Sequence, residues 1–305
     1  MLRRLVIFIA TAAQLQLASA QDKPRNLAAT FRTDAKLVLV PVTVTDGRGG
    51  IVNGLSAQDF TVTEDRVAQP MFSFVEQDAP VSLGVIFDIS ESVKNTISDA
   101  KVALRSFFEI SNPEDEAFLY TVSTHPQNRA GFTRDFGSLL GALVNAGAEG
   151  DTALDDAIYS GLNQIKSASH VRKALLIVSD GMDNHSRYSK RELMTLAVES
   201  DVQIYAISLY DPPRNKKAIE LREEQSGLLF LEELTRRTGG LQFVIRNARD
   251  LDQAATSLSR ALRNQYVIGY VPRTADHNRK WHSIQVKVDL QDARAHARSG
   301  YRSDD

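Results

Sequence analysis

The stretch VSLGVIFDISES, residues 81–92, decides the fold of this chain. Its first seven residues include β-branched and aromatic side chains in an apolar run, which predicts a strand buried on both faces of a parallel sheet. Open α/β sheets bind ligands beyond the carboxyl ends of their strands. This strand ends in Asp88, so the stretch predicts an α/β fold with a ligand site at that residue.

Two hydroxyl residues and two later segments complete a candidate cation site. Ser90 and Ser92 follow Asp88 at alternate positions, so an extended loop can turn all three side chains toward one point. Thr152 lies in the turn GDTAL at 150–154, and Asp180 ends the apolar run ALLIVSDG at 174–181. Carboxylate and hydroxyl oxygens are hard donors of the kind that Mg²⁺ prefers, so the pattern predicts a divalent cation site.

Each part of this site also has an ordinary structural explanation. Ser90 and Ser92 could cap the helix that follows, since serine is a favoured N-cap. Thr152 and Asp155 are spaced as a variant of the capping box, and Asp180 followed by glycine is a common turn. These alternatives do not explain why three such segments all fall at strand ends of one predicted sheet.

In order and spacing, the three segments resemble the metal-ion-dependent adhesion site of von Willebrand factor type A domains. That family uses Asp-x-Ser-x-Ser, a later Thr and a later Asp-Gly. The resemblance implies a Rossmann-like, doubly wound and mostly parallel sheet, and a metal site made by the residues Asp88, Ser90, Ser92, Thr152 and Asp180. It also implies that a carboxylate of a protein partner, from Asp or Glu, completes the coordination, so the expected activity is binding and not catalysis.

The donor set favours the same activity on physical grounds. An ion held mainly by neutral hydroxyls keeps most of its positive charge and therefore attracts an external anion. Mg²⁺ is the expected ion because it retains waters and needs few protein ligands. The chain departs from the family pattern at Glu91 and Asp151, and together with Asp183 these carboxylates would lie beside the ion. They make Mn²⁺ and Ca²⁺ the alternatives to Mg²⁺.

The amino terminus reads as a signal peptide over residues 1–20, with two arginines, an apolar stretch and a small-residue cleavage site. A polar linker over 21–34 follows. We therefore expect an exported protein, periplasmic or secreted. No later segment is long and apolar enough to span a membrane. The chain contains no cysteine, so disulfides cannot stabilise it.

Strand patterns flank the α/β region on both sides. Residues 35–78 alternate with period two, which predicts a small β unit, and residues 81–272 alternate between strands and helices. Within the latter, a strand over 266–271 is expected to complete the doubly wound sheet. Residues 273–305 return to period two, so we expect them to pack with 35–78 as one layer resembling a β-sandwich.

Four further stretches resemble the secreted acidobacterial group of von Willebrand type A-related proteins. They are VTVTDGRG at 42–49, GLSAQDFTVTED at 54–65, QYVIGY at 265–270 and RSGY at 298–301. That resemblance implies an architecture and no named ligand.

Other functions receive little support from the sequence. The formal net charge is −2, without the basic excess typical of nucleic-acid binding. The chain has no nucleophile elbow, HExxH pair or phosphate-binding glycine loop, so no enzyme is expected. The favoured function is a metal-dependent ligand-binding or adhesion module. The alternative is a structural envelope or assembly scaffold with a vestigial metal site, and the oligomeric state is not predicted.

Overall fold

The computed structural model describes residues 37–210, 218–273 and 280–303 of the 305-residue chain. The predicted signal peptide (1–20) and linker (21–34) lie outside the described residues.

A six-stranded sheet forms the centre of the α/β part, with strand order β10-β9-β8-β5-β6-β7. All neighbouring strands are parallel except β6 and β7, which are antiparallel. The strands are β5 (Val81–Asp88), β6 (Glu116–Val122), β7 (Pro126–Thr133), β8 (Arg172–Ser179), β9 (Gln203–Leu209) and β10 (Gln242–Ile245). Every residue of β5 is buried, as its continuous apolar pattern predicts.

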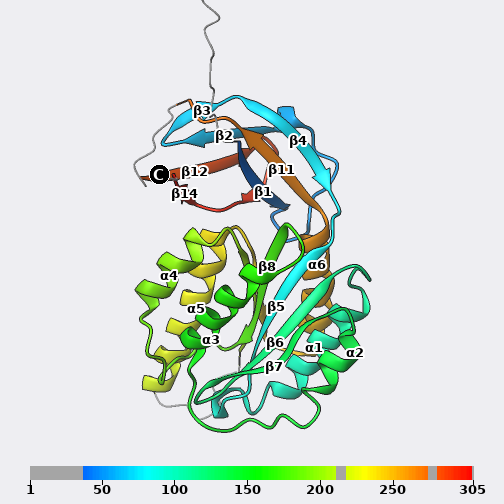
Figure 1. Ribbon diagram of the computed structural model, residues 1–305, viewed down its shortest axis with the longest axis vertical. Helices are drawn as coiled ribbons and strands as arrows, with labels where there is room; N and C mark the ends of the chain where they lie inside the picture. Colours follow the sequence, from blue (N-terminus) through cyan, green and yellow to red (C-terminus); the bar gives the residue numbers. More distant parts are fainter. Residues whose placement is uncertain (1–36, 211–217, 274–279, 304–305) are drawn as a thin grey trace, which may run out of the picture. The chain divides into compact units, whose positions relative to one another are not determined.

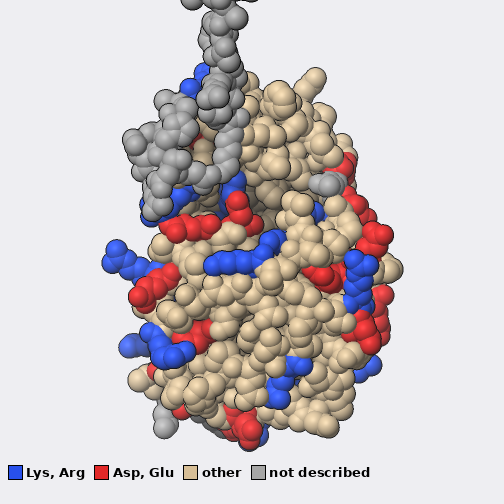
Figure 2. Space-filling model, viewed as in Figure 1, with Lys and Arg blue, Asp and Glu red and all other residues tan. Residues whose placement is uncertain are grey.

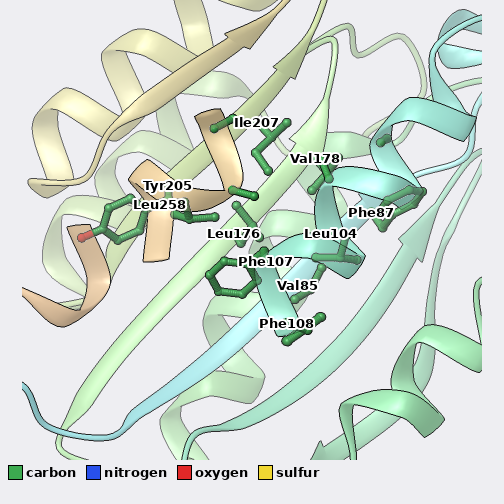
Figure 3. Packing of buried hydrophobic residues seen from close by; sticks show 14 of the residues in the cluster. Val85, Phe87, Leu104, Phe107, Phe108, Leu176, Val178, Tyr205, Ile207 and Leu258 are labelled. Carbon is green, nitrogen blue, oxygen red and sulfur yellow. The ribbon is translucent and has the colours of Figure 1, made fainter. Parts of the chain in front are cut away.

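Helices cover both faces of this sheet (Figure 1). They are α1 (Ile97–Glu109), α2 (Phe136–Gly141), α3 (Leu154–Gln164), α4 (Lys190–Glu199), α5 (Ala218–Thr238) and α6 (Ala248–Arg263). One apolar core joins the sheet to α1, α2 and α6, and another joins it to α3, α4 and α5. Figure 3 shows the first core, where Phe87 and Val178 of the sheet pack near Leu104 of α1. The predicted fold class, α/β with a mostly parallel sheet, is confirmed.

Two antiparallel sheets accompany the α/β part, with strand orders β13-β1-β11-β4 and β14-β12-β2-β3. Their strands are β1 (Val38–Thr45), β2 (Phe60–Glu64), β3 (Val67–Gln69), β4 (Met71–Gln77), β11 (Gln265–Tyr270), β12 (Trp281–Val288), β13 (Arg294–His296) and β14 (Gly300–Arg302). Strands from the two ends of the chain pair directly, β1 with β13 and β2 with β12.

The two antiparallel sheets share one apolar core. The four valines at 38, 40, 42 and 44 all face it, as the alternating pattern predicts. Phe60 of one sheet packs against Tyr266 of the other, with ring centroids 5.1 Å apart. The sheets therefore pack face to face.

The prediction that residues 266–271 complete the doubly wound sheet is wrong. Strand β11 instead lies between β1 and β4, antiparallel to both. Its Tyr266 and Tyr270 both point into the antiparallel core, where their hydroxyls form hydrogen bonds. Tyr266 accepts a hydrogen bond from the Leu55 amide at 3.0 Å, and Tyr270 donates to the Glu64 carboxylate at 2.6 Å.

Strand β7 was not predicted from the sequence. Its sequence, PQNRAGFT, has no apolar alternation, and most of its residues are at least partly exposed. Proline can begin such a strand because β7 is an edge strand, where one row of backbone amides needs no partner.

Charged side chains of both signs lie side by side on the face of the molecule shown in Figure 2. This mixture agrees with a formal net charge close to zero.

Candidate functional site

Asp88 is the last residue of β5 and is completely buried. Its Oδ1 accepts hydrogen bonds from the Ser90 amide at 2.9 Å and from the Ser90 hydroxyl at 2.6 Å. Its Oδ2 accepts one from the Ser179 hydroxyl at 2.6 Å. The carboxylate is thus oriented by donors from two adjacent strand ends.

The electrostatic surroundings of Asp88 oppose its ionisation. Burial removes the carboxylate from water, and the neighbouring Asp180 carboxylate adds a like charge. Together they raise the pKa of Asp88 to about 7, although the hydrogen bonds from Ser179 and Ser90 act in the opposite direction. A cation at this position would offset both unfavourable effects.

The hydroxyls of Ser90 and Ser92 lie 3.0 Å apart, so the loop after β5 turns both toward one point. Ser90 is fully buried, whereas Ser92 is exposed. Neither serine caps α1, because that helix begins after Thr96, and Ser90 makes no side-chain capping bond to the short 3₁₀ turn Glu91–Val93. The capping alternative for these two serines is therefore wrong.

Thr152 reaches the same edge of the sheet through a second loop. The Glu91 amide donates to the Gly150 carbonyl at 3.1 Å, which joins this loop to the one that follows Asp88. Thr152 is buried, and its amide donates to Asn184 Oδ1 at 2.9 Å. The N-cap of α3 is Ala153 and not Thr152, so the alternative explanation of Thr152 as part of a capping box is wrong.

Asp180 follows β8 in a third loop and is buried. Its Oδ1 accepts the Met182 amide at 3.0 Å. Gly181 has φ +80°, and a Cβ there would lie 2.5 Å from the Gly227 carbonyl oxygen of α5. This close approach of loop and helix fixes the backbone beside Asp180. The amides of Asn184 and His185, further along the same loop, both donate to the Thr152 carbonyl at 3.0 Å.

The five predicted ligands thus lie on three loops that are hydrogen-bonded to one another at the carboxyl edge of the sheet. The three additional carboxylates occupy different positions. Glu91 is exposed and pairs with Lys94 at 2.8 Å, and Asp151 is exposed, 3.8 Å from His185. Asp183 accepts the Asp155 amide at 2.8 Å and so satisfies the first turn of α3.

Sequence reasoning missed several residues of this edge. Ser179, the last residue of β8, donates to Asp88, and its only signal in the sequence is its position next to Asp180. His185 is exposed, and its ring lies 5.8 Å from that of His125 and beside Asp151. Asp155 is buried, and burial together with Asp183 raises its pKa to about 7.

The donor set suits a divalent cation of the Mg²⁺ type. Hydroxyls and carboxylates supply only oxygen, which is the ligand atom that Mg²⁺, Mn²⁺ and Ca²⁺ accept. Burial and the Asp180 carboxylate both raise the pKa of Asp88, so a cation would balance an otherwise unfavourable charge. The residues present therefore fit such an ion.

Known proteins resemble this chain in sequence pattern and in fold. The family model described as "von Willebrand factor type A domain" matches residues 83–182, which include all five predicted ligands. A solved structure of a von Willebrand factor type A protein from Catenulispora acidiphila is similar over 90% of this chain and 75% of that one, with 10% sequence identity and a TM-score of 0.50. An aerotolerance-related membrane protein from Bacteroides fragilis matches 60% of this chain and 98% of its own, at 15% identity and a TM-score of 0.47. No curated protein matches the sequence significantly.

Proposed function

We propose that residues 83–182, which match the family model of the von Willebrand factor type A domain, form a domain that binds a divalent cation and, through it, a carboxylate of a protein partner. Ser90, Ser92 and Thr152 would bind the ion through their hydroxyls. Asp88 and Asp180 would balance its charge, acting largely through water. Domains of this family commonly serve in adhesion or protein interaction and often hold a divalent metal.

One observation carries the proposal: the buried Asp88 carboxylate lies where three hydrogen-bonded loops meet, beside hydroxyl side chains that can bind a metal. Burying a carboxylate near another is unfavourable unless a positive charge balances it. A bound cation would supply that charge.

The chemistry of the site favours capture of an anion. Neutral hydroxyls leave the ion most of its charge, so an Asp or Glu side chain of a partner is the expected final ligand. The exposed Glu91 and Asp151 would repel a strongly acidic partner, which favours a single carboxylate in neutral or basic surroundings. Domains of this family are typically interaction modules without enzymatic activity, and we assign this chain a binding role.

Mg²⁺ is our first choice of ion, with Mn²⁺ and Ca²⁺ as alternatives. Mg²⁺ prefers six ligands in a strict octahedron and keeps several waters, which fits a site with three hydroxyl donors. The additional carboxylates near the edge would favour Ca²⁺ only if they moved inward to bind it.

The predicted signal peptide places this binding activity outside the cytoplasm, in the periplasm or the medium. Among the described helices, none is both long and apolar enough to cross a membrane. The grouping with secreted acidobacterial proteins is a proposal from sequence alone. So is the division into domains at 35–78, 81–272 and 273–305, in which β11 (Gln265–Tyr270) belongs to the antiparallel part.

Capture of partners from envelope and secreted fractions tests this function. The wild-type protein should retain a specific partner in Mg²⁺ and release it in EDTA. Asp88→Ala should retain nothing in either condition, whereas Asp289→Ala, which removes an exposed carboxylate in the antiparallel part, should behave as wild type. Partner binding that is unchanged by EDTA and by Asp88→Ala would contradict metal-dependent capture and favour a scaffold role.

A further inference from the structure

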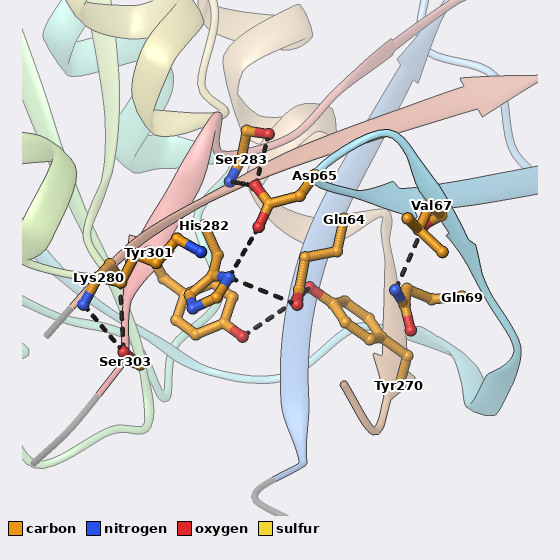
Figure 4. Close-up of polar contacts among 10 residues, drawn as sticks. All are labelled: Glu64, Asp65, Val67, Gln69, Tyr270, Lys280, His282, Ser283, Tyr301 and Ser303. Carbon is orange, nitrogen blue, oxygen red and sulfur yellow. Dashed lines mark hydrogen bonds and ion pairs between the residues drawn. The ribbon is translucent and has the colours of Figure 1, made fainter. Parts of the chain in front are cut away.

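A second group of metal-binding side chains lies in the antiparallel part of the molecule, on β2, β12 and the turn after β2. It consists of Glu64, Asp65 and His282, each of which offers one ligand atom, and these atoms lie within 4.8 Å of one another. His282 Nδ1 lies 2.9 Å from Asp65 Oδ2 and 3.7 Å from Glu64 Oε1 (Figure 4).

Strand pairing and a tight turn bring these residues together. In the register of β2 with β12, Glu64 lies opposite Ile284, two residues from His282. Asp65 begins the turn to β3 with φ 47°, a left-handed conformation that is uncommon outside glycine. The amide and hydroxyl of Ser283 both donate to Asp65 Oδ1, at 2.9 and 3.0 Å. Asp65 Oδ2 is therefore held toward His282.

Glu64 presents one oxygen to the group. The side chain is only 3% exposed, and its Oε2 accepts hydrogen bonds from Tyr270 at 2.6 Å and Tyr301 at 3.0 Å. Both tyrosine hydroxyls bond Oε2, which leaves Oε1 as the oxygen that faces His282. Its distance of 3.7 Å from His282 Nδ1 is too long for a hydrogen bond. Glu64 thus turns one carboxylate oxygen toward the imidazole while the two tyrosines hold the other.

The imidazole is held in a fixed orientation. His282 is 3% exposed, and its ring stacks on Tyr301, with centroids 5.4 Å apart and planes inclined by 26°. Nδ1 faces both carboxylates. Asp65, by contrast, exposes 43% of its side chain, so solvent reaches the group from that side.

We propose that Glu64, Asp65 and His282 form a second metal site, which takes a first-row transition ion of the Zn²⁺ class. Zn²⁺ binds His nitrogen and carboxylate oxygen at about 2.0–2.2 Å, so neighbouring ligands in a tetrahedron lie about 3.3 Å apart. The observed 2.9 and 3.7 Å lie on either side of that spacing. Bound metal replaces the Nδ1 proton of His282, and water at the open Asp65 side fills the fourth position.

The chemistry separates this site from the one at Asp88. Imidazole nitrogen favours Zn²⁺, Ni²⁺ and Cu²⁺ over Mg²⁺ and Ca²⁺, whereas the Asp88 site offers only oxygen. The charges of the group also favour a metal ion, because a divalent ion balances the two carboxylates that face a single imidazole. The second site therefore does not depend on the proposed adhesion function.

The ion would join distant parts of the chain. Asp65, in the turn after β2, and His282, on β12, are 217 residues apart in sequence. A ligand that binds only the folded state stabilises it. Zn²⁺ would thus lock β2 to β12 and stabilise the sheet that β3 and β14 complete.

The only tryptophan of the chain, Trp281, precedes His282 and provides a local test. The untagged full-length protein is titrated with Co²⁺, whose unpaired electrons quench nearby tryptophan emission, and the Co²⁺ is then displaced with Zn²⁺. We expect saturable quenching at one equivalent, reversed by Zn²⁺. His282→Gln should weaken it at least tenfold. Asp65→Asn keeps the turn and the Ser283 bonds, and should also weaken it about tenfold.

Two variants serve as controls. Asp292→Asn changes another exposed aspartate with a left-handed backbone, φ 57°, and should leave the quenching unchanged. Asp88→Ala should also leave it unchanged, which separates this site from the proposed Mg²⁺ site. If His282→Gln does not fold, the Co²⁺ titration of Asp65→Asn alone tests the proposal. If the wild type shows no saturable quenching, or if Asp65→Asn leaves the midpoint of the Co²⁺ titration unchanged, the three side chains only hydrogen-bond to one another and the proposal is overturned.

Discussion

At the scale of single residues, Asp88 is subject to two opposing influences. Three hydrogen bonds from Ser90 and Ser179 favour its ionised form, whereas burial and the Asp180 charge favour the neutral form, and the second influence is the stronger. A site that is unfavourable for its own carboxylate stabilises a cation when one is present. We therefore expect Asp88 to lower the stability of the metal-free protein while it supports cation binding.

Asp88→Asn tests this conflict. Asparagine keeps the shape and most of the hydrogen bonds but removes the buried charge, so in EDTA near pH 8 the variant should be more stable than wild type by about 1 kcal/mol or more. In Mg²⁺ the wild type should gain stability and the variant should not. Urea unfolding with and without Mg²⁺ measures both. A variant that is less stable than wild type in EDTA would contradict the balance inferred for Asp88.

The sequence predicted the acids and hydroxyls of this edge because each directly follows an apolar run or opens a helix. It did not single out Ser179, because a serine next to Asp180 at the end of a strand is only a weak signal. The group at Glu64, Asp65 and His282 was also beyond sequence reasoning, because 217 residues separate its members and only the strand register brings them together.

At the scale of elements, the loop after β8 depends on its contact with α5. Gly181 and Gly227 approach so closely that a Cβ on either residue would lie 2.5 Å from an atom of the other. Gly181 also needs φ +80°, which side chains other than glycine rarely adopt. The position of Asp180 is therefore determined partly by a helix whose contact with the loop cannot be read from local sequence.

Gly181→Ala should destabilise the protein by about 2–4 kcal/mol, from backbone strain plus the clash with α5. It should also weaken Mg²⁺ binding, because Asp180 must shift with the loop. Gly141→Ala is the matched control: that glycine ends α2 with open space around it, and alanine should be neutral or stabilising by up to about 1 kcal/mol. Urea unfolding and calorimetry measure the two effects. If the two variants were equally stable, the contact between Gly181 and α5 would not constrain the loop.

Strands were predictable where burial imposes a pattern. Residues 81–88 and 174–179 are buried throughout, and their sequences are mostly apolar. Strand β7 carries no such pattern because it is a partly exposed edge. Strand β11 was recognised as a strand but assigned to the wrong sheet, since Tyr266, Ile268 and Tyr270 fit either sheet and only their partners decide.

At the scale of the whole molecule, stability should depend on pH in the absence of metal. The pKa values of Asp88 and Asp155 are raised to about 7 in the folded protein, from an ordinary value of 3.8. Between about pH 4 and pH 7 the folded state therefore holds protons that the unfolded state has lost, and stability falls as pH rises. Burial lowers the pKa of His296 to about 4, which acts in the opposite direction below pH 6.5.

The contribution of Asp88 can be isolated by subtraction. The stability of the wild type relative to Asp88→Asn, measured in EDTA by urea unfolding, should decrease from pH 4 to pH 7. In Mg²⁺ this stability difference should change less with pH, because the bound ion stabilises the ionised form of Asp88. A difference that is constant or increases with pH would show that the carboxylate is not held neutral.

The antiparallel sheets should also lose order separately from the α/β part. Removing residues 273–305 deletes β12, β13 and β14, which leaves β2 without its long partner and uncovers Phe60 and Val62. Hydrogen exchange should then show lost protection in β1 to β3 and retained protection in β5 and β8. Loss of protection throughout the chain would mean that the two parts fold as one cooperative unit.

Metal binding at Asp88 is the central claim, and isothermal titration calorimetry of the full chain with Mg²⁺ tests it most directly. Wild type should bind one Mg²⁺ saturably, Asp88→Ala should bind none at that site, and His282→Gln should bind as wild type. No saturable binding by wild type, or the same binding by Asp88→Ala, would contradict the account.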